Sequence, residues 1–191
     1  MSTIPTPERT SPTPPNAGPS PASDTPGLSV RDARDDDALD VIELIAGVFG
    51  EYPGCITDVD GEMPELRALA SHFAALGGGF RVAEREGRVV GCCGWTPHGE
   101  LVELKKLYVH RRERGSGLGA VLIGEVEELA LARGARAVEL WSDTRFTRAH
   151  RFYEKRGYRR GSTRELFDKS DTVEFHFQLE LPTGGAPSGE R

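Results

Sequence analysis

A glycine-rich segment is the part of this 191-residue sequence best suited to bind a ligand. Residues 109–120 read VHRRERGSGLGA, with glycines at alternate positions, Gly115, Gly117 and Gly119. Glycine lets the backbone approach a ligand closely and adopt positive φ. The apolar pattern after Gly117 predicts a helix, whose first N–H groups and positive dipole end would face this turn. Such a turn is suited to a pyrophosphate group.

Three interpretations of this segment compete. It can be a surface turn with solvated arginines, or a dinucleotide-binding loop, because Gly115-x-Gly117-x-x-Ala120 fits a loosened form of that pattern. Charged residues separate Val109 from Gly115, and the preceding strand is not continuously apolar, which weighs against the dinucleotide loop. A Walker loop is excluded because no Gly-Lys-Ser/Thr follows. The third interpretation is a loop for the pyrophosphate of coenzyme A.

A second segment resembles a known pattern together with the first. Residues 149–158 read AHRFYEKRGY, a helical pattern with Tyr153 followed by the pair Gly157–Tyr158. Arg114-x-x-Gly117-x-Gly119 after an apolar strand resembles the acyl-CoA-binding signature of the GNAT superfamily of N-acetyltransferases, and residues 149–158 resemble its second signature. Both occur in the family's order, and the resemblance covers about residues 28–181.

The resemblance implies an enzyme that transfers an acetyl group from acetyl-CoA to a primary amine by direct attack in a ternary complex. It places the pantetheine arm against the backbone of Leu107, Tyr108 and Val109 like an added strand, with the Val109 amide as donor to the thioester oxygen. It places the pyrophosphate on Arg114, Gly115, Ser116, Gly117, Leu118, Gly119 and Ala120. Two positions depart from the family pattern: Arg111 replaces a frequent proline, and Phe146 replaces an asparagine that contacts the cofactor.

Acetyl transfer to an amine needs a base for the amine proton and an acid for the departing thiolate. Glu103 stands six residues before Val109, where the resemblance places a carboxylate base; the alternative is a Glu paired with Lys105. Tyr153 matches the family tyrosine whose hydroxyl points at the thioester sulfur; the alternative is a core tyrosine. We expect Glu103 and Tyr153 to be the catalytic residues.

The other polar residues suggest no second reaction. His110 and His150 stand among arginines and are expected to be exposed. Cys92 and Cys93 are expected to be small core residues, because no His and Asp accompany them as in a nucleophilic site. Asp143 can bind a cationic acceptor or cap the next helix, and the sequence does not separate these roles. No Cys/His spacing suggests a metal site.

The periodicity predicts a mixed, mostly antiparallel α/β sheet of about seven strands flanked by about four helices on both faces. Strands are expected at Leu28–Val30, Phe80–Ala83, Val89–Trp95, Leu101–Val109, Ala137–Trp141, Tyr158–Thr163 and Thr172–Leu181. Helices are expected at Asp35–Phe49, Pro64–Leu76, Gly117–Arg133 and Thr147–Arg156.

Composition sets the boundaries of this domain and the partners that we expect. Residues 1–26 hold eight of the thirteen prolines and almost no large apolar side chain, so this tail and residues 182–191 are expected to be disordered around a domain at 27–181. A net charge of −6 argues against a nucleic-acid partner. Without a membrane span or signal peptide, we expect a cytoplasmic enzyme. We expect its acceptor to be a small-molecule or peptide amine, and the fold is compatible with a homodimer. The alternative function is a non-catalytic acyl-CoA-binding sensor.

Overall fold

The computed structural model describes residues 27–182. The expected N-terminal tail and almost all of the C-terminal one therefore lie outside the described residues. The strands are β1 (Leu28–Asp32), β2 (Gly79–Arg85), β3 (Arg88–His98), β4 (Leu101–Val109), β5 (Ala137–Asp143), β6 (Arg159–Glu165) and β7 (Val173–Glu180). The α-helices are α1 (Ala38–Phe49), α2 (Val59–Glu62), α3 (Leu69–Ala75), α4 (Leu118–Ala132) and α5 (Thr147–Lys155).

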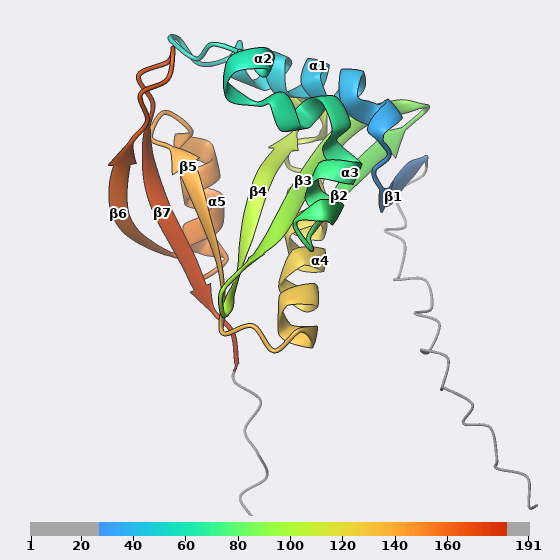
Figure 1. The fold of residues 1–191 in the computed structure, drawn as a ribbon. Helices are drawn as coiled ribbons and strands as arrows, with labels where there is room; N and C mark the ends of the chain where they lie inside the picture. The colour runs from blue at the N-terminus through green and yellow to red at the C-terminus, as the bar shows by residue number, and fades with distance from the viewer. Residues whose placement is uncertain (1–26, 183–191) are drawn as a thin grey trace, which may run out of the picture.

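The seven strands form one sheet in the order β1-β2-β3-β4-β5-β7-β6. All neighbours are antiparallel except β4 and β5, which are parallel and pair only from Leu101↔Ala137 to Glu103↔Glu139. Beyond Glu103 the two strands diverge, and Figure 1 shows them close at one end and apart at the other. The sheet is therefore open at its centre, between β4 and β5.

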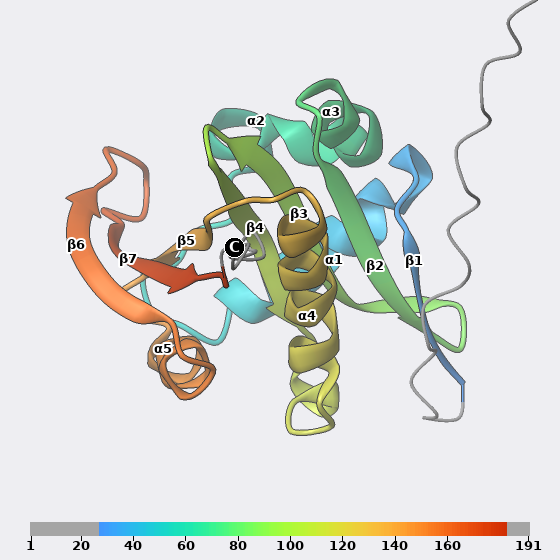
Figure 2. The ribbon, with the colours of Figure 1, turned by 90° about the horizontal axis from the view of Figure 1, so that it is seen from below.

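Two apolar clusters cover the two faces of the sheet. The first contains α4 and α5 side chains such as Leu122 and Tyr153 packed on Val102, Leu104 and Phe177. The second packs α1 and α3 on β2 and β3. In Figure 2, α4 and α5 lie on one side of the sheet and α2 and α3 on the other. This confirms the predicted mixed sheet with helices on both faces.

The main error of the sequence prediction lies between α1 and β2. The expected helix at Pro64–Leu76 is instead a 3-10 turn at Pro64–Ala68 followed by the short α3, and α2 was not expected. Ala68, with φ −143° and ψ 53°, leaves the helical region at the junction. Leu66, Leu69 and Phe73 are all buried, so tertiary packing rather than helix propensity sets this geometry.

Candidate functional site

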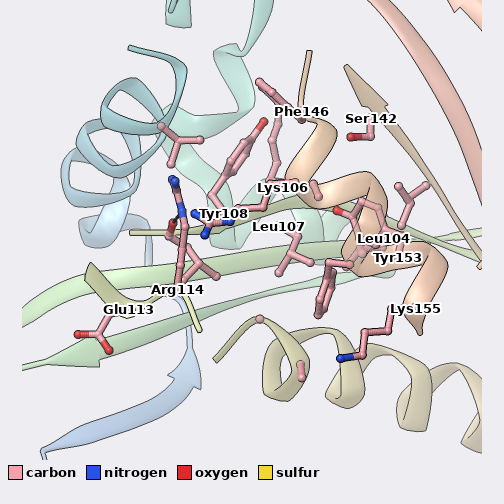
Figure 3. A pocket seen from close by; sticks show the side chains of 18 of the residues that line it. Leu104, Lys106, Leu107, Tyr108, Glu113, Arg114, Ser142, Phe146, Tyr153 and Lys155 are labelled. Carbon is pink, nitrogen blue, oxygen red and sulfur yellow. Dashed lines mark hydrogen bonds between the residues drawn. The ribbon is translucent and has the colours of Figure 1, made fainter. Parts of the chain in front are cut away.

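A cavity of about 530 Å³ lies where β4 and β5 separate, and we name it the main cavity (Figure 3). The end of α1, the second half of β4, the glycine-rich turn, β5 and α5 form its walls. Its lining residues include Leu104, Lys106, Leu107, Tyr108, Val109, Arg114, Gly115, Gly117, Gly119, Ala120, Trp141, Ser142, Phe146, Arg148, Phe152, Tyr153 and Lys155. Of the predicted binding residues, only Ser116 and Leu118 are not part of this wall.

A β-bulge in β4 shapes the edge of the main cavity. Cys92 of β3 faces Tyr108, whereas Gly94 faces Lys105, so β4 carries one extra residue between these pairs. Lys106 lies in this bulge with φ +54°, a left-handed conformation that is uncommon for a side-chain-bearing residue. Because the β4–β5 ladder ends at Glu103, the β5-facing edge of β4 is left without a strand partner along the cavity.

The Val109 amide points into this gap. The His110 N–H donates to the Val90 carbonyl at 2.8 Å, one residue beyond the pair Gly91↔Val109. In an antiparallel ladder this bond makes Gly91↔Val109 a non-hydrogen-bonded pair, so the Val109 N–H and C=O are directed away from β3. The Val109 carbonyl accepts from Arg114 Nε at 3.1 Å, and the Val109 N–H remains directed to the side where β5 has left.

The glycine-rich turn has the geometry of an anion site. Gly115 and Gly117 have φ of +86° and +94°, and a Cβ built on either glycine meets no atom within 4 Å. Open space therefore lies over the backbone at the first turn of α4. The N–H groups of Gly117 and Gly119 donate to no group in the described part of the chain, and both glycines line the main cavity. The cavity and these free donors fit a pantetheine arm and a pyrophosphate.

Arg114 is already engaged in the structure. Its Nη atoms lie 2.6 and 2.7 Å from the two carboxylate oxygens of Glu51, which follows α1. The hydrogen bond from Arg114 lowers the pKa of Glu51. Arg114 therefore joins the glycine-rich turn to the end of α1. In this structure it holds the turn in place and also adds positive charge beside it.

Tyr153 of α5 lies in the wall of the main cavity, near Leu104 (Figure 3). Its ring packs against Phe152, Tyr158 and Phe177, with centroid distances of 5.4–5.8 Å, so the ring does belong to the core. Burial raises the pKa of its phenol well above the usual range. The hydroxyl has no hydrogen-bond partner among the described residues. Every fully buried side-chain polar atom of those residues does have a partner, so the Tyr153 hydroxyl is not fully buried. The hydroxyl is therefore accessible from the cavity.

Two cations of α5 also line the main cavity and were not predicted. Arg148 and Lys155 form no ion pair with any described residue, and Lys155 extends from α5 toward the beginning of α4 (Figure 3). Arg148, Phe152 and Lys155 are spaced i, i+4, i+7, which places them on one helix face. The sequence signal that could have revealed Arg148 and Lys155 is this spacing, which places two cations on the same helix face as Phe152.

Phe146, which replaces the family asparagine, contributes to an aromatic wall. Its ring lies 4.6 Å from Tyr52 and 5.9 Å from Phe49, and Phe49 in turn lies 5.9 Å from Tyr108. This position therefore supplies apolar packing between α1 and α5 instead of an amide contact.

A second cavity of about 450 Å³ adjoins the first, and we name it the second cavity. It lies under the α1–α2 segment and the β6–β7 loop, and Lys106 and Tyr108 line both cavities. The two loops are joined across it: Ile56 N–H donates to Ser170 Oγ at 2.9 Å, and Lys169 N–H donates to Glu62 at 2.7 Å. The two cavities thus meet at the end of β4.

Glu103 and Tyr153 are not brought together. Val102 and Leu104 belong to the cluster under α4 and α5, so Glu103 between them points to the opposite face. Its carboxylate lies 2.6 Å from Lys105 Nζ, as in the alternative that the sequence offered, and it lines neither cavity. Glu103 does lie on the sheet face that carries the second cavity. Its register partner on β5 is Glu139, and Glu139 points to the same face as Asp143, which lines that cavity.

The predictions for the remaining polar residues were wrong for His150 and confirmed for Cys92 and Cys93. His150 is buried, not exposed: its Nε2 lies 2.9 Å from the Asp143 carbonyl, and burial lowers its pKa. Cys92 and Cys93 are core residues as predicted, and burial raises the pKa of Cys92 to about 12. Asp143 does not cap α5; it pairs with Arg145 at 2.6 Å on the wall of the second cavity.

Comparisons with known proteins agree with this geometry. Residues 48–158 match the Acetyltransferase (GNAT) family. A Bacillus subtilis (strain 168) protein named as an acetyltransferase is 30% identical over 127 residues, covering 66% of this chain and 79% of that protein.

Solved structures share the fold. A GNAT-family acetyltransferase from Staphylococcus aureus Mu50 has a TM-score of 0.71 at 21% identity, covering 81% of this chain and 99% of that one. An acetyltransferase from Salmonella typhimurium, solved with its cofactor acetyl-CoA, has a TM-score of 0.61 at 20% identity, covering 84% and 98%. The main cavity, its free N–H donors and the family match lead to one conclusion: this chain belongs to the GNAT family of acetyltransferases, which use acetyl-CoA.

Proposed function

We propose that this protein transfers the acetyl group of acetyl-CoA to a primary amine by direct attack in a ternary complex. The observation that carries the proposal is the pair of adjoining cavities at the end of β4, of about 530 and 450 Å³. One suits an extended pantetheine arm, and the other gives an amine its own approach to the same point. A sensor that only bound acyl-CoA would need no second cavity there.

The walls of the main cavity would hold the cofactor along its length. The N–H groups of the turn at Arg114–Ala120, with Lys155 and Arg148 opposite, suit the phosphates. The unpaired edge of Leu107, Tyr108 and Val109 suits the amides of the pantetheine arm. The cofactor supplies an activated acetyl group as a thioester, and the Val109 N–H is directed to where its carbonyl oxygen would need a donor.

Tyr153 is the residue that we assign to the leaving thiolate. Tyr153 lines the main cavity, and burial raises the pKa of its phenol further above neutrality, so the hydroxyl is protonated at neutral pH. A protonated phenol can donate a hydrogen bond or a proton to the sulfur as negative charge develops there. Glu103 as the base stays a prediction, because it lies on the acceptor face of the sheet but outside both cavity walls.

The experiment is a screen of primary amines for acetyl-CoA-dependent release of CoA thiol by the purified full-length chain. The panel should include amino acids, polyamines, aminoglycosides and peptides, because the acceptor class is part of the proposal. Thiol release with at least one amine supports transfer. Tight acetyl-CoA binding without release from any amine would favour the sensor.

No helix among residues 27–182 is long and apolar enough to cross a membrane. The expected cytoplasmic location and homodimer stay predictions.

A further inference from the structure

We propose that Glu174, on β7, is the carboxylate that binds the acceptor ammonium and accepts its proton. This inference rests on the proposed function, since it assigns a base to the same reaction. The acceptor amine is proposed to approach through the second cavity, which Tyr108 lines. The base that takes the amine proton should therefore line the second cavity close to Tyr108. Glu103 lines neither cavity, whereas Glu174 lines the second.

Five carboxylates line the second cavity: Glu62, Asp143, Glu165, Asp168 and Glu174. Glu62 and Asp168 accept backbone N–H bonds within the β6–β7 connection, from Lys169 and from Ser170 and Thr172 respectively, and Glu165 is exposed at the end of β6. Asp143 and Glu174 lie side by side as register partners on β5 and β7. Burial raises the pKa of Tyr108, and the negative charges of Glu174 and Asp143 act in the same direction. These two carboxylates are therefore the ones near the junction of the cavities.

Hydrogen bonding separates Glu174 from Asp143. Both oxygens of Asp143 accept bonds from Arg145, at 2.6–3.1 Å. Among residues 27–182, only Oε2 of Glu174 has a partner, and it accepts from Arg164 Nε at 2.7 Å. The side chain of Glu174 is 16% exposed, so its free Oε1 is sheltered but reachable from the cavity. A carboxylate with a free oxygen can take a new charge-assisted bond, whereas Asp143 is saturated.

A set of stacked side chains holds Glu174 in place. Arg164 lies 4.1 Å over the Trp141 ring, and that ring lies 4.9 Å from His176. His176 Nε2 lies 3.0 Å from Glu139, which is buried. Trp141 also lines the main cavity, so the residues that orient Glu174 touch the wall where the thioester would lie. Arg164 is a positioning residue in this arrangement.

The acceptor ammonium gives one proton to Glu174 Oε1, directly or through a water, and the free amine forms a bond to the acetyl carbon. The carbon–sulfur bond then breaks, and the sulfur takes up a proton from the Tyr153 side. The nitrogen loses its second proton to solvent as the amide forms, Tyr153 takes a proton back from solvent, and Glu174 releases its proton to solvent, so one proton in total is released per turnover.

The test is kcat/KM of thiol release for the wild type, Glu174→Gln and Glu103→Gln between pH 6 and 10, with the fastest amine of the wild-type screen. We expect Glu174→Gln to lose about 10²-fold near neutrality. The loss should shrink toward the amine's own pKa, near 10.4 for a lysine-like amine, because the free amine is then abundant. Glu180→Gln removes the same charge from the far end of β7 and serves as the matched control.

Three outcomes decide the proposal. A pH-dependent loss in Glu174→Gln with an unchanged KM for acetyl-CoA supports it. Wild-type activity in Glu174→Gln, or a loss that is equal at every pH, overturns it while leaving acetyl transfer intact. A pH-dependent loss in Glu103→Gln instead of Glu174→Gln overturns it in favour of the sequence prediction. Absence of wild-type turnover with every amine contradicts the proposed function itself and would be seen before any variant is made.

Discussion

Tyr153 combines two properties that the sequence presented as alternatives, a place in the core and a hydroxyl at the cavity. Its ring is part of the core under α5, and its hydroxyl remains accessible from the main cavity. The sequence could predict the residue from its motif, but it could not show that core packing and a free hydroxyl occur together. A buried ring fixes the position of the hydroxyl, as a catalytic acid requires.

The Tyr153→Phe variant tests the acid role. The ring and its packing are kept, and the lost hydroxyl bonds to no described residue, so the free energy of unfolding should change little. If the hydroxyl stabilises the leaving thiolate, kcat should fall by roughly 10²-fold with little change in the KM for acetyl-CoA. Steady-state kinetics with a melting curve measures both. A wild-type kcat in the folded variant would leave Tyr153 as a core residue only.

His150 gives a prediction about stability and pH. Burial lowers its pKa below the ordinary 6.5, so the unfolded chain binds this proton more readily than the folded one. Its contribution to stability is therefore complete above about pH 6.5 and falls as the pH drops below that value. Urea unfolding at pH 7.5 and 5.5 should show a smaller acid loss for His150→Gln than for the wild type. The exposed His72→Gln is the control, and an acid loss equal to that of wild type in His150→Gln would contradict the assignment.

At the scale of elements, the glycine-rich turn and α4 were predictable and the bulge in β4 was not. Glycine spacing followed by a helical apolar pattern is a local signal, and α4 begins one residue after Gly117. The bulge at Lys106 carries no glycine or proline, and its one trace in the sequence is the change of inward-facing positions from Val102 and Leu104 to Leu107 and Val109. The same holds for the 3-10 turn before α3, where buried contacts with neighbouring elements override local propensity.

The first turn of α4 can be tested with a matched pair of variants. Gly117→Asp places a carboxylate beside the free N–H groups, so acetyl-CoA affinity should fall by at least 10²-fold in calorimetry. Gly134→Asp at the other end of α4 also adds a Cβ at positive φ (+71°), with no atom within 4 Å. Both should lose roughly 1–2 kcal/mol of stability for the left-handed conformation. Equal cofactor affinity in the two variants would remove the pyrophosphate assignment from this turn.

At the scale of the whole molecule, the sequence predicted the sheet and its helices but not the placement of the two predicted catalytic residues on opposite faces. Glu103 and Tyr153 both came from motifs, and the fold places them on opposite faces because Glu103 alternates with buried Val102 and Leu104. The second cavity is built from the α1–α2 segment, the end of β4, the end of β5, the β6–β7 connection and the start of β7, within residues 49–63, 106–108, 143–145 and 165–174. Such a set shares no local pattern, so only the fold could bring it together.

We expect acetyl-CoA in the main cavity to meet an amine from the second cavity at the end of β4. The most direct measurement follows an isotopically labelled acetyl group from acetyl-CoA into the amine product, for the wild type and Gly117→Asp, with the acceptor panel described above. We predict labelled N-acetyl product from the wild type, in equal amount to the CoA released, and a large loss in the folded Gly117→Asp variant. A wild-type protein that binds acetyl-CoA but labels no amine, or a Gly117→Asp variant that labels it at the wild-type rate, would contradict the account.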